Sequence, residues 1–217
     1  MKTRIALIHA LTMSMQPVTE AFARAWPEAE TLNILDDSLS RDRATMDDVT
    51  PAMTKRFDSL LAYALDIGAE GVVFACSAFG PSIEAARAAT SIPVLKPNEA
   101  MFEAALERGP RVGLLATFEP SLPPMREEFD ALAAARGVEL TLHTHCAPDA
   151  MQALRDGDRE AHDRIVAEAA TALDDCQVIM LAQFSMAPAA GAVRPSVDCP
   201  VLTSPDAAVA KLRRLLE

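Results

Sequence analysis

The two halves of this chain repeat each other at a constant offset of 107 residues, and this repeat limits the possible fold more than any other feature. Three pairs of blocks align in the same order: RIALIHALTMSMQP (4–17) with RVGLLATFEPSLPP (111–124), FACSAFGPS (74–82) with LAQFSMAPA (181–189), and IPVLKPNEA (92–100) with CPVLTSPDA (199–207). Three blocks sharing one order and one offset indicate an ancestral unit that was duplicated in tandem.

The copies differ at a residue that matters for chemistry. At the offset of 107, Cys76 in the first copy corresponds to Gln183 in the second. A thiol can act as an acid, a base or a nucleophile, whereas a glutamine amide has no useful acid-base chemistry. The duplicated site therefore carries one thiol rather than two.

Length and composition agree with a duplicated globular protein. A chain of 217 residues, half of them hydrophobic, can bury one large core or two cores of about 100 residues each. The offset favours two domains. We expect a first domain formed by residues 1–97 and 203–217 and a second formed by residues 98–202.

Charge and cysteine usage exclude several classes of function. The net charge of −11 argues against nucleic acid or an anionic membrane as a partner, although backbone amides can still bind a small anion. The first residues lack a signal-peptide pattern and no apolar run reaches about 18 residues, so a cytoplasmic protein is expected. The four cysteines show no CxxC spacing, which predicts reduced thiols and no zinc site. A homodimer or higher homo-oligomer is the expected assembly.

Short apolar runs alternate with longer amphipathic runs, as in βαβ units around a parallel sheet. The predicted strands are 4–9, 30–35, 70–75, 93–95, 111–116, 138–143, 177–182 and 200–202. The predicted helices are 17–26, 50–68, 81–90, 98–108, 120–136, 158–174 and 204–216. This order predicts an α/β protein of two pseudo-symmetric flavodoxin-like domains, each a parallel sheet of about four strands flanked by helices.

Ligands of open parallel sheets bind beyond the carboxyl ends of the strands, and four loops of this chain lie there. They are residues 9–15, 76–82, 117–121 and 183–187. If the copies face each other across a pseudo-twofold axis, Cys76 and Gln183 approach one active-site cleft from opposite walls.

The same loops resemble those of the aspartate/glutamate/hydantoin racemase superfamily. The likeness covers essentially the whole chain and is carried by IALIHA, VVFACSAFG, VGLLATFEPS and VIMLAQFSMAPA. The resemblance implies an enzyme without cofactors, in which a cysteine on each side of a carbon next to a carboxylate removes or delivers a proton. The role carries over to Cys76, while Gln183 stands where the family commonly has its second cysteine. The superfamily also resembles maleate cis-trans isomerases and arylmalonate decarboxylases, and the latter use one thiol, located in the second copy.

Local chemistry also supports a role for Cys76. It follows a strand and precedes a helix, where free backbone N–H groups and the helix dipole stabilise a thiolate. The alternative is an inert buried cysteine chosen for its size. His9 ends the first strand and is a candidate to return the proton, the alternative being a packing histidine.

The loop residues around these positions form the predicted substrate-binding set: Ser77, Ala78, Thr117, Phe118, Ser121, Phe184 and Ser185. Exposed amides and hydroxyls in strand-to-helix turns can hold a carboxylate or the enediolate formed from it, although serine and threonine are also common helix caps. The aromatic pair Phe118 and Phe184 forms either an apolar wall or part of the core.

The remaining titratable residues are expected to be structural. His143 and His145 alternate along one strand with Cys146 and lack a further ligand, so no metal site is predicted. His162 lies on an exposed helical pattern where pairing at the surface is expected.

Three functions compete. The first is a racemase or isomerase acting at the carbon α to a carboxylate of an amino acid or related acid, with Cys76 as base or nucleophile; thiolate addition that permits cis-trans rotation is a variant. The second is a lyase in which Cys76 protonates a carbanion left by CO₂ loss. The third is a non-catalytic protein that binds small carboxylates. The superfamily resemblance favours an isomerase, and the absence of arginine from the four loops disfavours aspartate and glutamate as substrates.

Overall fold

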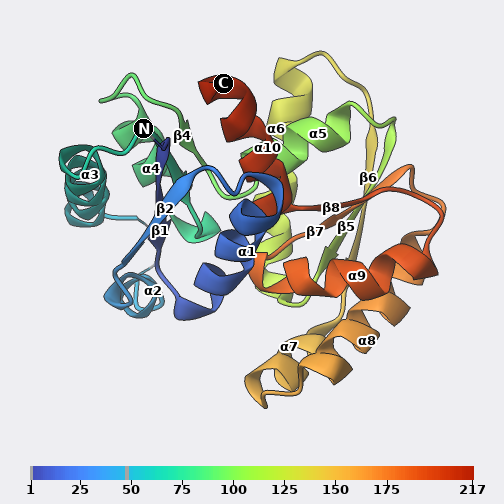
Figure 1. Cartoon of the computed structure of the whole chain (residues 1–217). Coiled ribbons are helices and arrows are strands. Elements are labelled where there is room, and N and C mark those ends of the chain that lie inside the picture. Colours follow the sequence, from blue (N-terminus) through green and yellow to red (C-terminus); the bar gives the residue numbers. More distant parts are fainter. Residues whose placement is uncertain (1, 47–48) are drawn as a thin grey trace. The chain divides into compact units, whose positions relative to one another are not determined.

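The computed structural model describes residues 2–46 and 49–217. The chain forms two compact units, Met1–Glu99 with Ala208–Glu217 (unit 1) and Ala100–Ala207 (unit 2). Strands and helices alternate through both units (Figure 1). Among the described residues no helix is long and apolar enough to cross a membrane.

Unit 1 contains a four-stranded parallel sheet. Its strands, in the order β2-β1-β3-β4, are Glu30–Leu35, Arg4–His9, Gly71–Phe74 and Val94–Leu95. β1 and β3 lie in the centre and are almost entirely buried, which explains why their sequences are continuous apolar runs. All four strands run in the same direction, so their carboxyl ends share one edge of the sheet. We call this the carboxyl edge.

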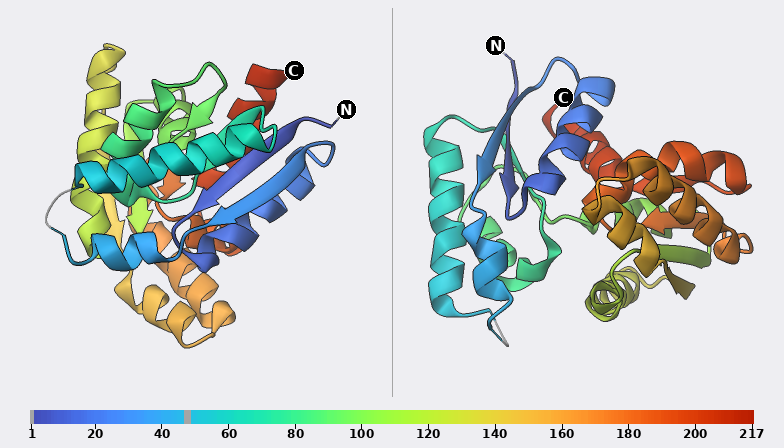
Figure 2. Two further views of the ribbon diagram at one scale, coloured as in Figure 1. Left: turned by 90° about the vertical axis from the view of Figure 1, so that its left-hand side faces the viewer. Right: turned by 90° about the horizontal axis from the view of Figure 1, so that it is seen from below.

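Helices cover both faces of the unit 1 sheet. The helical segments are η1 Thr12–Ser14, α1 Met15–Ala25, α2 Ser38–Arg43, α3 Pro51–Asp66, η2 Ser77–Phe79, α4 Gly80–Arg87, and α10 Ser204–Leu216, most of which belongs to this unit. One core cluster joins side chains of α2, α3 and α4 to β1 and β3. Figure 2 shows α3 on one side of β1 and β2, with α1 and α10 on the other.

Helix ends follow the expected local signals. The side chain of Thr50 accepts a hydrogen bond from the Met53 N–H at 3.2 Å, and Pro51 occupies the first turn of α3. The chain then leaves α3 through Gly68, whose φ of 79° is the left-handed conformation that favours glycine. Gly137 follows α6 (Leu122–Ala135) in the same way, with a φ of 65°.

Unit 2 repeats this architecture. Its strands, in the order β6-β5-β7-β8, are Thr141–Cys146, Arg111–Ala116, Val178–Leu181 and Val201–Thr203. Its helical segments are α5 Glu99–Leu106, η3 Glu119–Ser121, α6 Leu122–Ala135, α7 Pro148–Arg155, α8 Arg159–Ala170, η4 Thr171–Leu173, η5 Phe184–Ala189, α9 Ala190–Val193 and η6 Arg194–Ser196. One core cluster contains residues of α5 and α6, and the other contains residues of α7, α8 and α9. The two clusters lie on opposite faces of this sheet (Figure 1).

The duplication extends to individual hydrogen bonds. The Arg4 N–H donates to Glu70 Oε1 at 3.2 Å, and the Arg111 N–H donates to Gln177 Oε1 at 3.0 Å, with both residues shifted by 107. A second pair is the ion pair between Arg87 and Glu99, which recurs in unit 2 between Arg194 and Asp206. The two copies thus conserve interactions as well as element order.

The predicted fold class of two parallel four-stranded α/β sheets is confirmed. The predicted strand 138–143 was wrong by three residues, since β6 spans Thr141–Cys146. The Thr141 N–H bonds to Pro110 O at 2.7 Å and starts the pairing with β5, whereas Val138 and Leu140 pack into the core before the strand begins. The short helices α2 and α7 were not predicted, because segments of six and eight residues span only about two helical turns and give a weak periodic signal.

Candidate active site

Cys76 lies at the carboxyl edge of unit 1, just beyond β3. The Ala75 N–H still bonds to Ile8 O at 2.9 Å, so the sheet holds the chain up to the residue before the thiol. Cys76 is extended, with φ −139° and ψ 119°, and is partly exposed. η2 and α4 follow it directly.

An aromatic cluster holds the segment after Cys76 in place. Phe79 is fully buried, and its ring centroid lies 4.9 Å from that of Phe57 on α3. Phe57 also packs on Phe74 at the end of β3, with centroids 5.4 Å apart. Because Phe79 is buried, the exposed residues Ser77 and Ala78 remain at the surface beside the thiol. The position of Cys76 is therefore fixed by core packing on both sides along the chain.

The environment of Cys76 differs from the expected thiolate-stabilising one. Burial raises the pKa of the Cys76 thiol, and the hydrogen bond from the Ala78 backbone N–H lowers it by less. The expected amide is present, but desolvation of the thiolate outweighs it. Below pH 8, Cys76 is mainly a protonated thiol.

His9 lies at the carboxyl end of β1 and is fully buried. Its Nδ1 atom is 2.8 Å from Ser14 Oγ, and its Nε2 atom is 2.9 Å from the side-chain amide of Asn33. Burial lowers the pKa of His9, and the hydrogen bond to Asn33 raises it by less. The lowered pKa favours a neutral ring at pH 7. His9 must break one of these hydrogen bonds before it can pass a proton to a substrate.

Arg43, which the sequence analysis did not single out, lies beside the Cys76 loop. It is the last residue of α2, and its Nε atom donates to Ala78 O at 3.4 Å while Nη1 donates to Met46 O. None of the four loops contains an arginine, so loop sequences gave no signal for it. Only the folding of α2 against the sheet brings this cation to the carboxyl edge.

Gln183 occupies the equivalent place at the carboxyl edge of unit 2, just beyond β7. Its Oε1 accepts from the Thr117 N–H at 3.1 Å and from Thr117 Oγ1 at 3.4 Å. Its Nε2 donates to Ser121 Oγ at 2.8 Å, and Ser121 Oγ donates to Phe118 O at 2.6 Å. The structure therefore brings Thr117, Ser121 and Gln183 together as one hydrogen-bonded group.

The apolar residues near these loops separate into core and surface. Phe184 is buried, and Met186 and Phe79 are fully buried, so these three belong to the core. Phe118 is 46% exposed and stands at the surface of the loop between β5 and α6. Ser185 is half-buried in η5.

The remaining cysteines lie elsewhere in unit 2. Cys176 and Cys199 precede β7 and β8, on the sheet edge opposite to Gln183. Cys146 ends β6, and burial followed by the charge of Glu119 raises the pKa of its thiol. In the described part of the chain, no three histidine, cysteine or acidic side chains come together as a metal site.

His162 was expected on an exposed helix face, and that expectation is wrong. The residue is 1% exposed. Its Nδ1 atom lies 2.7 Å from Asp163 Oδ1. α8 packs against α7, α9 and η5, so more of its surface is covered than its sequence pattern indicated.

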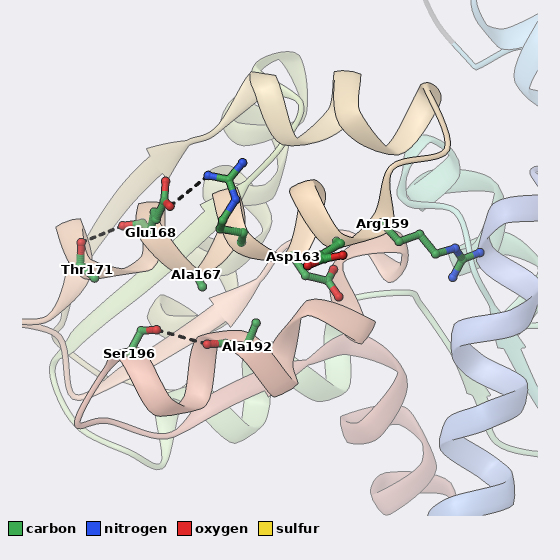
Figure 3. A pocket seen from close by; sticks show the side chains of 9 residues that line it. Arg159, Asp163, Ala167, Glu168, Thr171, Ala192 and Ser196 are labelled. Atoms are coloured by element: carbon green, nitrogen blue, oxygen red, sulfur yellow. Dashed lines mark hydrogen bonds and ion pairs between the residues drawn. The ribbon is translucent and has the colours of Figure 1, made fainter.

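A groove of about 680 Å³ lies on unit 2, lined by residues of α8, Thr171, Ala192 and Ser196 (Figure 3). Its polar side chains are engaged locally: the Thr171 hydroxyl donates to Glu168 O at 2.7 Å, and Ser196 Oγ donates to Ala192 O at 3.2 Å. None of the candidate site residues of the described chain is among its lining residues, so this groove does not coincide with the carboxyl edge.

Comparison with known proteins gives a consistent result. The Asp/Glu/Hydantoin racemase family pattern matches residues 12–212. No curated protein matches the chain by sequence. Among solved structures, allantoin racemase from Klebsiella pneumoniae is 23% identical, with 99% of this chain and 87% of that chain covered and a TM-score of 0.72. A glutamate racemase isoform from Bacillus anthracis is 17% identical, with 99% and 81% covered and a TM-score of 0.71.

A variant of arylmalonate decarboxylase is also similar, at 18% identity, with 98% and 92% covered and a TM-score of 0.68. Identities this low show a shared fold. The family pattern spans both copies of the duplicated unit, including the loops of Cys76 and Gln183, and the fold agrees with it. The chain therefore belongs to the Asp/Glu/hydantoin racemase family.

Proposed function

We propose that this protein is a cofactor-independent isomerase of the racemase type, acting at the carbon α to a carboxylate, with Cys76 as its acid-base group. The observation that carries the proposal is the place of Cys76: a partly exposed residue at the carboxyl edge, in the loop whose sequence resembles the first cysteine loop of the family, fixed by core packing on both sides. An inert packing cysteine needs none of this positioning.

The reaction begins when the thiolate of Cys76 takes the α-proton of the bound acid. The C–H electron pair moves into the carboxylate and gives an enediolate, while the sulfur becomes S–H. The backbone amide of the exposed residue Ser77 and the guanidinium of Arg43 are the groups of unit 1 suited to hold the growing negative charge. For inversion a water molecule delivers a proton to the opposite face of the carbanion and restores the C–H bond, and the Cys76 thiol gives its proton to the hydroxide left behind, which regenerates the thiolate.

The substrate class follows from the residues at the surface of the loops. Leu11 and Phe118 are related by the 107-residue offset and are 45% and 46% exposed. Both follow the central strand of their unit, and both are apolar. We propose a monocarboxylate or hydantoin-type acid with an apolar substituent rather than a second carboxylate.

A lyase is the second candidate, and two observations favour it. Burial keeps the Cys76 thiol protonated, and the amide of Gln183 is committed to hydrogen bonds within its own unit. After loss of CO₂, a protonated thiol can deliver its proton to the carbanion and regain one from water. This sequence needs one thiol only.

The test is proton NMR in D₂O with a panel of amino acids, hydantoins, arylmalonates and maleate, for wild type, Cys76→Ala and the matched control Cys199→Ala. The isomerase proposal predicts loss of the α-proton signal with wild type and Cys199→Ala but not with Cys76→Ala. Release of CO₂ with deuterium entering the product favours the lyase. No reaction with any member of the panel, in folded protein that binds one of them, would contradict both.

A further inference from the structure

The same tight turn follows the central strand in both units. In unit 1, Ser14 Oγ donates to Leu11 O at 2.8 Å; in unit 2, Ser121 Oγ donates to Phe118 O at 2.6 Å. Donor and acceptor are shifted by 107 residues, so this is one inherited interaction present twice. In unit 2 the Ser121 hydroxyl uses its hydrogen to close the turn, and its oxygen remains free to accept another hydrogen bond.

The two units contact that serine with different side chains. In unit 1 the contact is His9, whose Nδ1 lies 2.8 Å from Ser14 Oγ. His9 Nε2 donates to Asn33 Oδ1 at 2.9 Å, so Nδ1 of the neutral ring is an acceptor that faces the Ser14 hydroxyl. In unit 2 the residue equivalent to His9 is Ala116, which has no polar side chain. There Gln183 reaches over from the end of β7 and donates to Ser121 Oγ at 2.8 Å.

Gln183 makes a second connection to the same loop through its amide oxygen. Oε1 accepts the Thr117 N–H at 3.1 Å, and Thr117 is only 2% exposed. The amide thus ties both ends of the loop 117–121 to the end of β7. Loss of one such hydrogen bond leaves a buried N–H without its partner, which is costly.

We propose that Gln183 is a positioning residue that braces the loop 117–121 through its hydrogen bonds to Thr117 and Ser121, whereas in unit 1 it is His9 that contacts the equivalent serine, Ser14. Position 183 therefore supplies a structural amide where the family commonly has a second thiol, and Cys76 is the acid-base side chain of the proposed site. The catalytic consequence rests on the proposed function, whereas the brace itself does not.

The structural test is hydrogen-deuterium exchange of the backbone amides of 117–121 in wild type, Gln183→Met and Gln183→Asn. The matched control is Gln152→Met, because Gln152 is an exposed glutamine on α7 whose amide donates to Asp156 Oδ1 just past the end of that helix. A lost hydrogen bond of ordinary strength corresponds to about fivefold faster exchange. We expect at least that acceleration in Gln183→Met and none in Gln152→Met. Unchanged exchange of 117–121 in Gln183→Met would overturn the brace.

Ser121→Ala serves as the second variant, since it removes only the acceptor and keeps the Thr117 contact. Its exchange is expected to rise less than that of Gln183→Met. If the amides of 117–121 exchange equally fast in Ser121→Ala and wild type but faster in Gln183→Met, then only the hydrogen bond to Thr117 holds the loop. That result would overturn the role assigned to Ser121.

The kinetic test compares Gln183→Cys with Gln183→Ser on any acid that wild type converts. If 183 is a positioning residue, both variants lose the brace and fall by the same factor in kcat/KM, with an unchanged pH profile. Faster α-proton exchange in Gln183→Cys than in wild type would overturn the proposal, because a thiol at 183 would then transfer protons. If wild type converts nothing, the proposed function fails while the exchange experiment still decides whether the brace exists.

Discussion

The raised pKa of Cys76 makes a prediction about the pH dependence of the reaction. An unperturbed cysteine has a pKa of about 8.5, so about 3% of it is ionised at pH 7. Burial raises the pKa of Cys76 further, because removing water from around the sulfur disfavours the thiolate more than the Ala78 N–H favours it. The ionised fraction at pH 7 is therefore below about 3% and grows almost tenfold for each pH unit up to the pKa.

For an isomerase the thiolate is the base, so kcat/KM for α-proton exchange should rise about tenfold between pH 7 and pH 8 and continue to rise beyond pH 8.5. The quantity kcat/KM is used because it reports the ionisation of the free enzyme. The assay is proton NMR in D₂O at constant ionic strength, with Cys76→Ser as control. A lyase that uses the protonated thiol should instead show a flat profile that falls above the pKa. A rate that is independent of pH between 7 and 9 for α-proton exchange would refute the reasoning, because it would require a thiol that is already ionised.

Three further predictions concern neighbouring groups. Burial alone would raise the pKa of Glu99, but hydrogen bonds from Lys211 and Arg87 lower it. Since the Glu99 side chain is only 13% exposed, Glu99→Gln should lower the free energy of unfolding by about 2–3 kcal/mol at pH 7, measured by urea unfolding. The stability difference between wild type and Glu99→Gln should shrink as pH falls below about 4.5. The matched change Glu168→Gln, in a pair more than 60% exposed, should cost less than about 0.5 kcal/mol, and equal losses would contradict the argument. His9 has a lowered pKa, so the unfolded chain binds the extra proton first and stability should decline as pH falls below about 6.5; His9→Gln should flatten the unfolding free energy between pH 5 and 6.5, and an unchanged slope would exclude His9 as its source. Arg43→Ala should raise KM for a carboxylate at least tenfold while shifting the melting temperature little, because the hydrogen bonds of this side chain to the described residues go to two backbone carbonyls, those of Met46 and Ala78; an unaltered KM would remove Arg43 from the site.

Much of the fold could be predicted because it depends on local pattern. The buried central strands are continuous apolar runs, and β1 and β5 lie where the 107-residue offset placed them. Errors arose where a pattern had two interpretations. The apolar residues Val138 and Leu140 suggested an early strand, and pairing with β5 moved its start to Thr141.

The sequence by itself determined that the chain is a duplicated α/β protein and that Cys76 has no thiol counterpart, since both follow from comparing residues at one offset. The tertiary structure alone decided how these residues behave. Groups far away in the chain decide whether burial or a backbone amide has the larger effect on the pKa of Cys76. They also decide which loop Gln183 binds. Desolvation and hydrogen-bond geometry arise only when those distant segments pack together, so no local pattern encodes them.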